Sequence, residues 1–136
     1  MILVDTSVWS LVFRRNRKDL NPHEKHVVFA MRDLIVAGEA LSIGPVRQEL
    51  LSGVSDTAFF KRLQEQIESQ LDIPLTDDIW ILAARLFNTC RATGIAPDAI
   101  DMTVCAAAST HSLPIFTTDP DFTRYTTVLP IKLFKP

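Results

Sequence analysis

Six acidic residues stand where a parallel α/β sheet would bring them to one edge: Asp5, Glu49, Asp98, Asp101, Asp119 and Asp121. Asp5 directly follows the apolar run 2–4, and Asp119 follows the apolar and hydroxyl run 115–118. Ligands bind at the carboxyl ends of parallel strands, because loops and helix N-termini converge there. Grouped carboxylates repel one another, so the usual reason to gather them is a hard divalent cation, which prefers oxygen ligands.

Each acid also has an ordinary explanation. Asp5 could serve only as the N-cap of a helix that begins at Thr6, and Glu49 could be a solvated surface residue. Asp119 could cap the turn at Pro120, and Asp121 could support the site or be solvated. Individually these are weak signals, and only their conjunction indicates a site.

Asp98 and Asp101 lie three residues apart at a helix start and therefore share one face. Complementation of the helix dipole explains Asp98, which follows Pro97 in the first turn. It explains Asp101 less well, because the segment 104–108 that follows is apolar on nearly every side and is predicted to be buried. An aspartate that enters such a helix is expected to face something specific.

The elements that must position these acids alternate along the chain. We expect short strands over 2–4, 40–43, 71–73, 113–117 and 128–134. We expect helices over 6–13, 23–36, 45–53, 57–69, 77–92 and 98–111, with a helical turn from 119. This alternation predicts an α/β fold with a mostly parallel sheet covered by helices on both faces. Pro130 argues for an edge position of the last strand, and 136 residues fit one domain over 1–136.

The composition bounds the class of protein. With 47% hydrophobic and 22% charged residues the chain is globular, and a net charge of −2 gives no overall basic field. Cys90 and Cys105 both fall in apolar, helical stretches, which favours reduced, buried thiols over a disulfide framework. Neither a secretory signal pattern nor an apolar run long enough to cross a bilayer is present, so a cytoplasmic location is expected.

Taken together, the motifs resemble a PIN-domain ribonuclease, and among these a VapC-type toxin of a toxin–antitoxin pair. The resemblance rests on Val4-Asp5-Thr6-Ser7, a central Glu49, Asp101 ten residues before His111, and the segment 117–122, and it spans essentially the whole chain. It implies a three-layer PIN-like fold and a metal-dependent RNA endonuclease that uses Mg²⁺ or Mn²⁺. Expected partners are an RNA substrate, a cognate antitoxin protein and a second copy of the chain.

The resemblance also assigns roles to residues. The implied catalytic quartet is Asp5, Glu49, Asp101 and Asp119. Of these, Asp5, Asp101 and Asp119 would bind the metal, and Glu49 would orient or deprotonate the attacking water. The accessory residues are Thr6, Ser7, Asp98, Thr117 and Asp121, and Asp98 competes with Asp101 for the third place in the quartet.

Several other features are ambiguous. The basic loop 14–18 is equally consistent with RNA phosphate binding and with a solvated surface. Trp9 and Trp80 are predicted to pack in the core, and Phe59 and Phe60 to lie in the core or on an apolar surface that faces a partner. The three histidines and two cysteines show no zinc spacing.

Three other classes of protein compete with the nuclease interpretation. A haloacid-dehalogenase-like phosphatase would need a second acid two residues after Asp5, where Ser7 stands. A receiver domain would need paired acids near the start and a lysine after a late strand. The stronger competitor is a PIN-like module that binds RNA or protein without cutting, although all four expected acids are present.

Overall fold

A four-stranded parallel sheet forms the centre of the computed structural model, which describes residues 1–136. Its order is β3-β2-β1-β4, with β1 at Ile2–Val4, β2 at Ala40–Ser42, β3 at Leu71–Asp72 and β4 at Ile115–Phe116. The central strand β1 pairs Leu3 with Leu41 of β2 on one side and with Ile115 of β4 on the other. Because β1 and β4 are parallel neighbours, the residues that follow them meet at one edge of the sheet.

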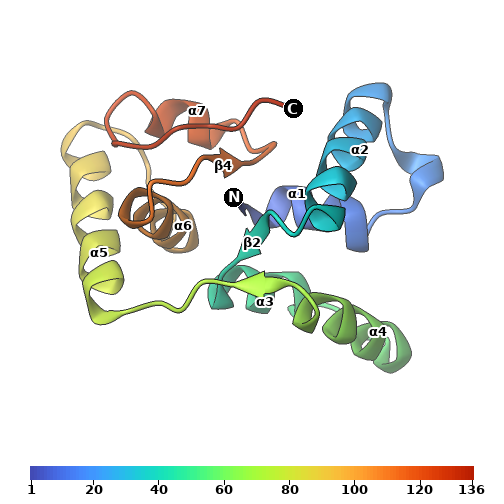
Figure 1. Ribbon diagram of the computed structural model, residues 1–136. Coiled ribbons are helices and arrows are strands. Elements are labelled where there is room, and N and C mark those ends of the chain that lie inside the picture. The colour runs from blue at the N-terminus through green and yellow to red at the C-terminus, as the bar shows by residue number, and fades with distance from the viewer.

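Helices cover both faces of this sheet, which confirms the predicted α/β architecture. They are α1 (Thr6–Phe13), α2 (Pro22–Val36), α3 (Gly44–Leu51), α4 (Thr57–Glu68), α5 (Asp77–Ala92), α6 (Ala99–Thr110) and α7 (Asp121–Tyr125), with the 3-10 turn η1 (Arg17–Asp19). Figure 1 shows the strands nearly edge-on, with α5 and α6 on one side and α1 and α2 on the other. No helix has the length and apolar character that crossing a bilayer requires.

The core is one cluster of 34 buried apolar residues, and α6 contributes most densely to it. Seven consecutive α6 residues, 102–108, are buried, as the apolar run predicted. Asp98 caps this helix by accepting hydrogen bonds from the backbone N–H groups of Ile100 (2.9 Å) and Asp101 (3.0 Å). The cap fixes the first turn and so the place where Asp101 leaves the helix.

The prediction of a final strand over 128–134 is wrong. The segment makes one isolated parallel bridge, between Ile115 and Leu133, supported by Ile115 N–H donating to the Lys132 carbonyl at 2.8 Å. Leu129 and Ile131 form a tight turn around Pro130, which has no N–H to donate. Too few residues therefore run alongside β4 to form a ladder.

Of the two tryptophan predictions, one is confirmed and one is wrong. Trp9 is 1% exposed and donates Nε1–H to the Val4 carbonyl at 3.1 Å. Trp80 is 48% exposed, because the buried stripe of α5 runs through Ile79, Ala83 and Leu86 and leaves Trp80 outside it. Phe59 packs partly buried against the core, whereas Phe60 is exposed. Cys90 and Cys105 are buried and unbridged, as expected.

Candidate active site

Asp5 lies at the junction between β1 and α1 and is 4% exposed. Its Oδ2 accepts hydrogen bonds from Ser7 Oγ (2.8 Å), from Thr117 Oγ1 (2.9 Å) and, more weakly, from Ser7 N–H (3.4 Å). Burial raises the pKa of Asp5, and the hydrogen bonds from Ser7 and Thr117 oppose that rise. Asp5 is therefore the N-cap of α1 and also a buried acid, so the capping explanation accounts for only part of its environment.

Two hydroxyl groups connect the end of β1 to the loop after β4. Ser7 Oγ accepts from Thr118 N–H at 3.0 Å, and Thr117 Oγ1 accepts from Asp119 N–H at 3.0 Å. Both hydroxyls also donate to Asp5, so each serves as a bridge between the two segments. Strands β1 and β4 converge at one edge of the sheet, as predicted. Ser7 and Thr117 link the segments that follow these strands and so fix Asp119 relative to Asp5.

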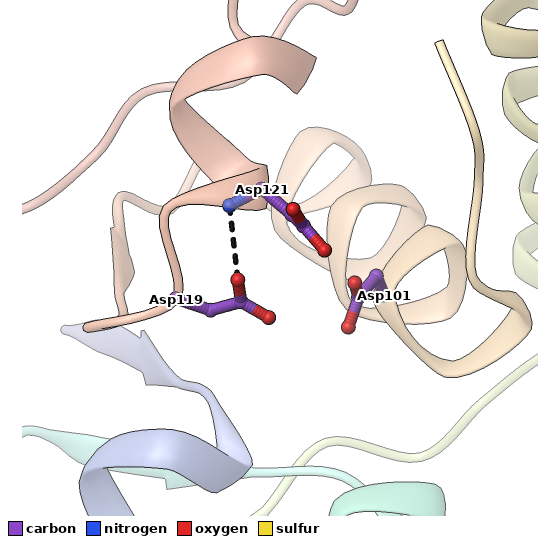
Figure 2. Close-up of side chains that lie close together, drawn as sticks. All are labelled: Asp101, Asp119 and Asp121. Atoms are coloured by element: carbon purple, nitrogen blue, oxygen red, sulfur yellow. Dashed lines mark hydrogen bonds between the residues drawn. The ribbon is translucent and has the colours of Figure 1, made fainter.

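Three carboxylates form the acid cluster, defined here as Asp101, Asp119 and Asp121, each with an oxygen within 4.8 Å of the others. Figure 2 shows Asp101 reaching from α6 toward Asp119 and Asp121, which stand just before and at the start of α7. Asp121 N–H donates to Asp119 Oδ1 at 2.9 Å and so holds the Asp119 side chain in place. Asp121, predicted only as an accessory residue, lies within the same 4.8 Å limit of Asp101 and Asp119.

The pKa of Asp101 is strongly raised. Burial and the charges of Asp5, Asp98 and Asp119 raise its pKa to about 7. A hydrogen bond from Tyr125 opposes this rise. Tyr125 Oη–H donates to Asp101 Oδ2 at 3.0 Å, and Tyr125 itself is buried. Sequence reasoning missed this residue, although its position four residues after Asp121 on a helical turn was a usable signal.

Asp98 and Asp101 are now distinguished by geometry. Asp98 Oδ1 is occupied by two backbone N–H groups at the start of α6, whereas Asp101 faces Asp119 and Asp121. Asp98 is also exposed. Of the two, Asp101 is the one that joins the acid cluster.

Glu49 lies on α3 and is exposed, and it lies near enough to the same acids for their charges to affect its pKa. Partial burial and the negative charges of Asp5, Asp98 and Asp119 raise its pKa, while the nearby Thr6 hydroxyl lowers it. Thr6 Oγ1 is buried without a hydrogen bond of ordinary geometry, so its interaction with Glu49 is a weak one. Glu49 therefore stands at the rim of the acidic site and is not one of the three clustered carboxylates.

The donor set fits a hard divalent cation. All three clustered side chains offer oxygen, and the only ion pair to any of them is between Asp121 and the exposed Arg124. Three carboxylates thus share one paired cation, and the charges of Asp5, Asp98 and Asp119 add to burial in raising the pKa of Asp101. Oxygen donors at this density suit Mg²⁺ or Mn²⁺ far better than a soft metal.

Solved structures of similar fold come from bacterial complexes. FitAcB from Neisseria gonorrhoeae is 22% identical, with a TM-score of 0.73 over 100% of this chain and 98% of that chain. VapBC2 from Rickettsia felis, bound to a promoter DNA fragment, is 17% identical with a TM-score of 0.71 over 98% of each chain. VapBC-5 from Mycobacterium tuberculosis, a member of the VapBC family of toxin–antitoxin systems, is 19% identical with a TM-score of 0.67 over 99% and 98%.

At these identities the likeness establishes the fold, and the family comes from the sequence. No curated protein shows significant sequence similarity to the chain. The family model described as PIN domain matches residues 2–127, which include every acid of the candidate site. The chain therefore belongs to the PIN domain family.

Proposed function

We propose that the chain is a metal-dependent endoribonuclease and the toxin of a toxin–antitoxin pair. The observation that carries the proposal is the cluster of Asp101, Asp119 and Asp121, which lies near the buried Asp5 and has a single ion pair, between Asp121 and Arg124. Such a cluster is costly to a fold unless it serves a cation. The whole chain, 1–136, would act as one nuclease domain in the cytoplasm.

The residues of the site divide into three tasks. Asp5, Asp101 and Asp119 are proposed to hold Mg²⁺ or Mn²⁺, and Asp121 adds a third carboxylate to the group that Asp101 and Asp119 form. The chemistry that such an ion supplies is a lowered pKa of water and neutralised charge on the phosphate. Glu49, exposed at the rim with a raised pKa, is suited to accept a proton from the attacking water near neutral pH. Ser7 and Thr117 hold Asp5 and Asp119 in register.

The toxin assignment draws on the solved relatives. VapBC-5 is described as a member of a toxin–antitoxin family, and its alignment with this chain covers 98% of the VapBC-5 chain. We infer that a small antitoxin binds this chain and inhibits it, and that the toxin is a homodimer. A short reading frame beside the gene is expected to encode a protein that abolishes cleavage when it is added to the purified toxin. Undiminished cleavage in the presence of that protein would contradict the toxin assignment.

Cleavage of total RNA tests the nuclease proposal. Purified protein with Mg²⁺ or Mn²⁺ is expected to give discrete fragments, and a chelator is expected to suppress them. Asp101→Asn should be inactive, whereas Asp56→Asn should match the wild type, because Asp56 is exposed and its side chain caps nothing. Fragments that persist equally with chelator and with Asp101→Asn would contradict the proposal. A folded wild type that binds RNA without cutting would favour the non-catalytic binding module.

Tyr125→Phe isolates the hydroxyl that sequence reasoning missed. Phenylalanine keeps the ring that packs edge-on against Phe122 at 5.3 Å but removes the donor to Asp101. We expect the Mg²⁺ concentration for half-maximal cleavage to rise about tenfold, while the rate at saturating metal changes little. Isothermal calorimetry of Mg²⁺ binding, without RNA, provides a second readout. An unchanged Mg²⁺ affinity would show that the hydroxyl does not position Asp101.

A further inference from the structure

Part of the basic loop lines a cavity that includes none of the acids of the candidate site. The basic pocket, of about 410 Å³, lies between η1 and α2 and is bordered by four cations: Arg17, Lys18, Lys25 and Arg32. Leu20 and Val28 are buried and form its apolar floor, and Phe29 stands on its wall with 66% exposure. Arg14 and Arg15, the other arginines of the basic loop, do not line it. Two residues of the basic loop, Arg17 and Lys18, thus border this pocket, although the whole loop 14–18 is exposed.

The cations of the basic pocket are unpaired. The three ion pairs of the chain join Arg15 to Glu24, Arg47 to Asp72 and Arg124 to Asp121, and none involves a lining residue. Glu24, one residue before Lys25, already accepts from Asn21 N–H at 3.1 Å and pairs with Arg15. Four cations without ion pairs thus line one pocket in a chain whose net charge is −2.

Local hydrogen bonds hold the two walls of the basic pocket. On one wall, Asn16 Oδ1 accepts from Lys18 N–H at 3.1 Å and caps η1. On the other, Asn21 and Glu24 form a capping box at the start of α2. Along α2, Lys25, Phe29 and Arg32 follow at helical spacing and share one face. The backbone of both walls is therefore held in place, and it presents the four cations around one exposed aromatic ring.

We propose that the basic pocket binds single-stranded RNA, with the four cations on backbone phosphates and a base stacked on Phe29. An exposed aromatic among unpaired cations matches the two requirements of such binding, a positive groove and a stacking platform. A purely acidic peptide would use the cations but would leave Phe29 without a role. The proposal rests on the proposed function only for its substrate class, because binding is measured without cleavage.

The position of the basic pocket predicts the length of RNA that it serves. Helix α1 leads from Asp5 to Phe13 and spans about 12 Å at about 1.5 Å per residue, and η1 follows beyond it. In Figure 1 η1 and α2 lie at the opposite end of the molecule from α5. A strand that occupies both the acidic site and the basic pocket must therefore extend over several nucleotides, within the range of about 4–16 known for single-strand sites.

The test measures binding of a labelled single-stranded RNA of about 12 nucleotides by fluorescence anisotropy, with Asp101→Asn in every protein to prevent cleavage. The charge variant carries Lys25→Glu and Arg32→Glu. Its matched control carries Lys61→Glu and Lys135→Glu, which are exposed and outside the pocket. We expect the charge variant to weaken binding at least tenfold more than the control does. We also expect it to flatten the plot of log affinity against log salt by about 1.4, the value for two lost phosphate contacts.

Phe29→Ala tests the stacking part separately. We expect about fivefold weaker binding or more, an unchanged salt dependence, and recovery with Phe29→Tyr. Equal affinities of the charge variant and its control would overturn the proposal. So would weakening by charge reversal with no effect of Phe29→Ala, because the pocket would then attract polyanions of any kind. A chain without Asp101→Asn that binds RNA but does not cleave it would count against the nuclease proposal. That result would leave the RNA-binding role of the basic pocket standing.

Discussion

Replacing Asp101 by Asn is expected to stabilise the metal-free protein at alkaline pH while it removes RNA cleavage. The pKa of Asp101 is raised from 3.8 to about 7, so in the folded state this carboxyl holds a proton that the unfolded chain has already lost. Between these two pKa values the folded state binds more protons, and the free energy of unfolding must fall as pH rises. Asparagine carries no charge at any pH and does not contribute to this loss.

The size of the effect is limited by solvent. Asp101 is only partly buried, so the gain at about pH 8 should be about 1–2 kcal/mol, less than the full pKa shift would give. Below pH 3.8 the carboxyl is protonated in both the folded and the unfolded state, and the two proteins should have nearly equal stability. A residual fall with pH should remain in the variant, because the pKa values of Asp5 and Glu49 are raised as well.

Urea unfolding of the chelator-treated protein at several pH values measures this prediction. Asp56→Asn is the control and should follow the wild-type curve, since Asp56 is exposed and its side chain makes no cap hydrogen bond. Added Mg²⁺ should reverse the order of stability at about pH 8, because only the wild type retains the full donor set. Cleavage by Asp101→Asn should fall about 100-fold or more. A variant less stable than the metal-free wild type at alkaline pH would show that Asp101 is not electrostatically strained.

The contrast between predicted and observed features has physical causes. Asp5 and Asp119 could be placed together from sequence because parallel strands end at one edge, a rule that depends only on topology. The role of Asp121 could not, because it depends on the rotation of the five-residue helix α7, which carries Asp121 toward Asp101. One residue of rotation moves a side chain by roughly 100°, and no pattern over five residues fixes it.

Packing partners decide the other differences. Trp80 occupies a position adjacent to the buried stripe of α5, and only the placement of α6 reveals which side of that boundary it takes. The final segment has a strand-like composition, but its turn at Pro130 leaves a single bridge to β4. The basic pocket follows from the position of η1 against α2, a long-range arrangement that the sequence of the basic loop does not encode locally.

Asp5 is expected to respond to substitution in two separable ways. Asp5→Ala removes the N-cap of α1 and the acceptor shared by Ser7 and Thr117, so the free energy of unfolding should fall by about 2 kcal/mol. The loss is partial, because the Ser7 and Thr117 hydroxyls lie 3.2 Å apart and can bond to each other. Removing a buried carboxylate whose pKa is raised offsets a further part of it.

Asp5→Asn separates this structural role from the chemical one. The amide oxygen can still accept from Ser7 and Thr117, so stability should remain within about 1 kcal/mol of the wild type. Cleavage should nevertheless fall about 100-fold or more, because the amide is a much weaker metal ligand than a carboxylate. Thermal unfolding and RNA cleavage, measured on both variants with Asp56→Asn as the control, check the two effects. Full metal-dependent cleavage by Asp5→Asn would remove Asp5 from the metal site and leave it as a cap, and the cation would then depend on Asp101, Asp119 and Asp121 alone.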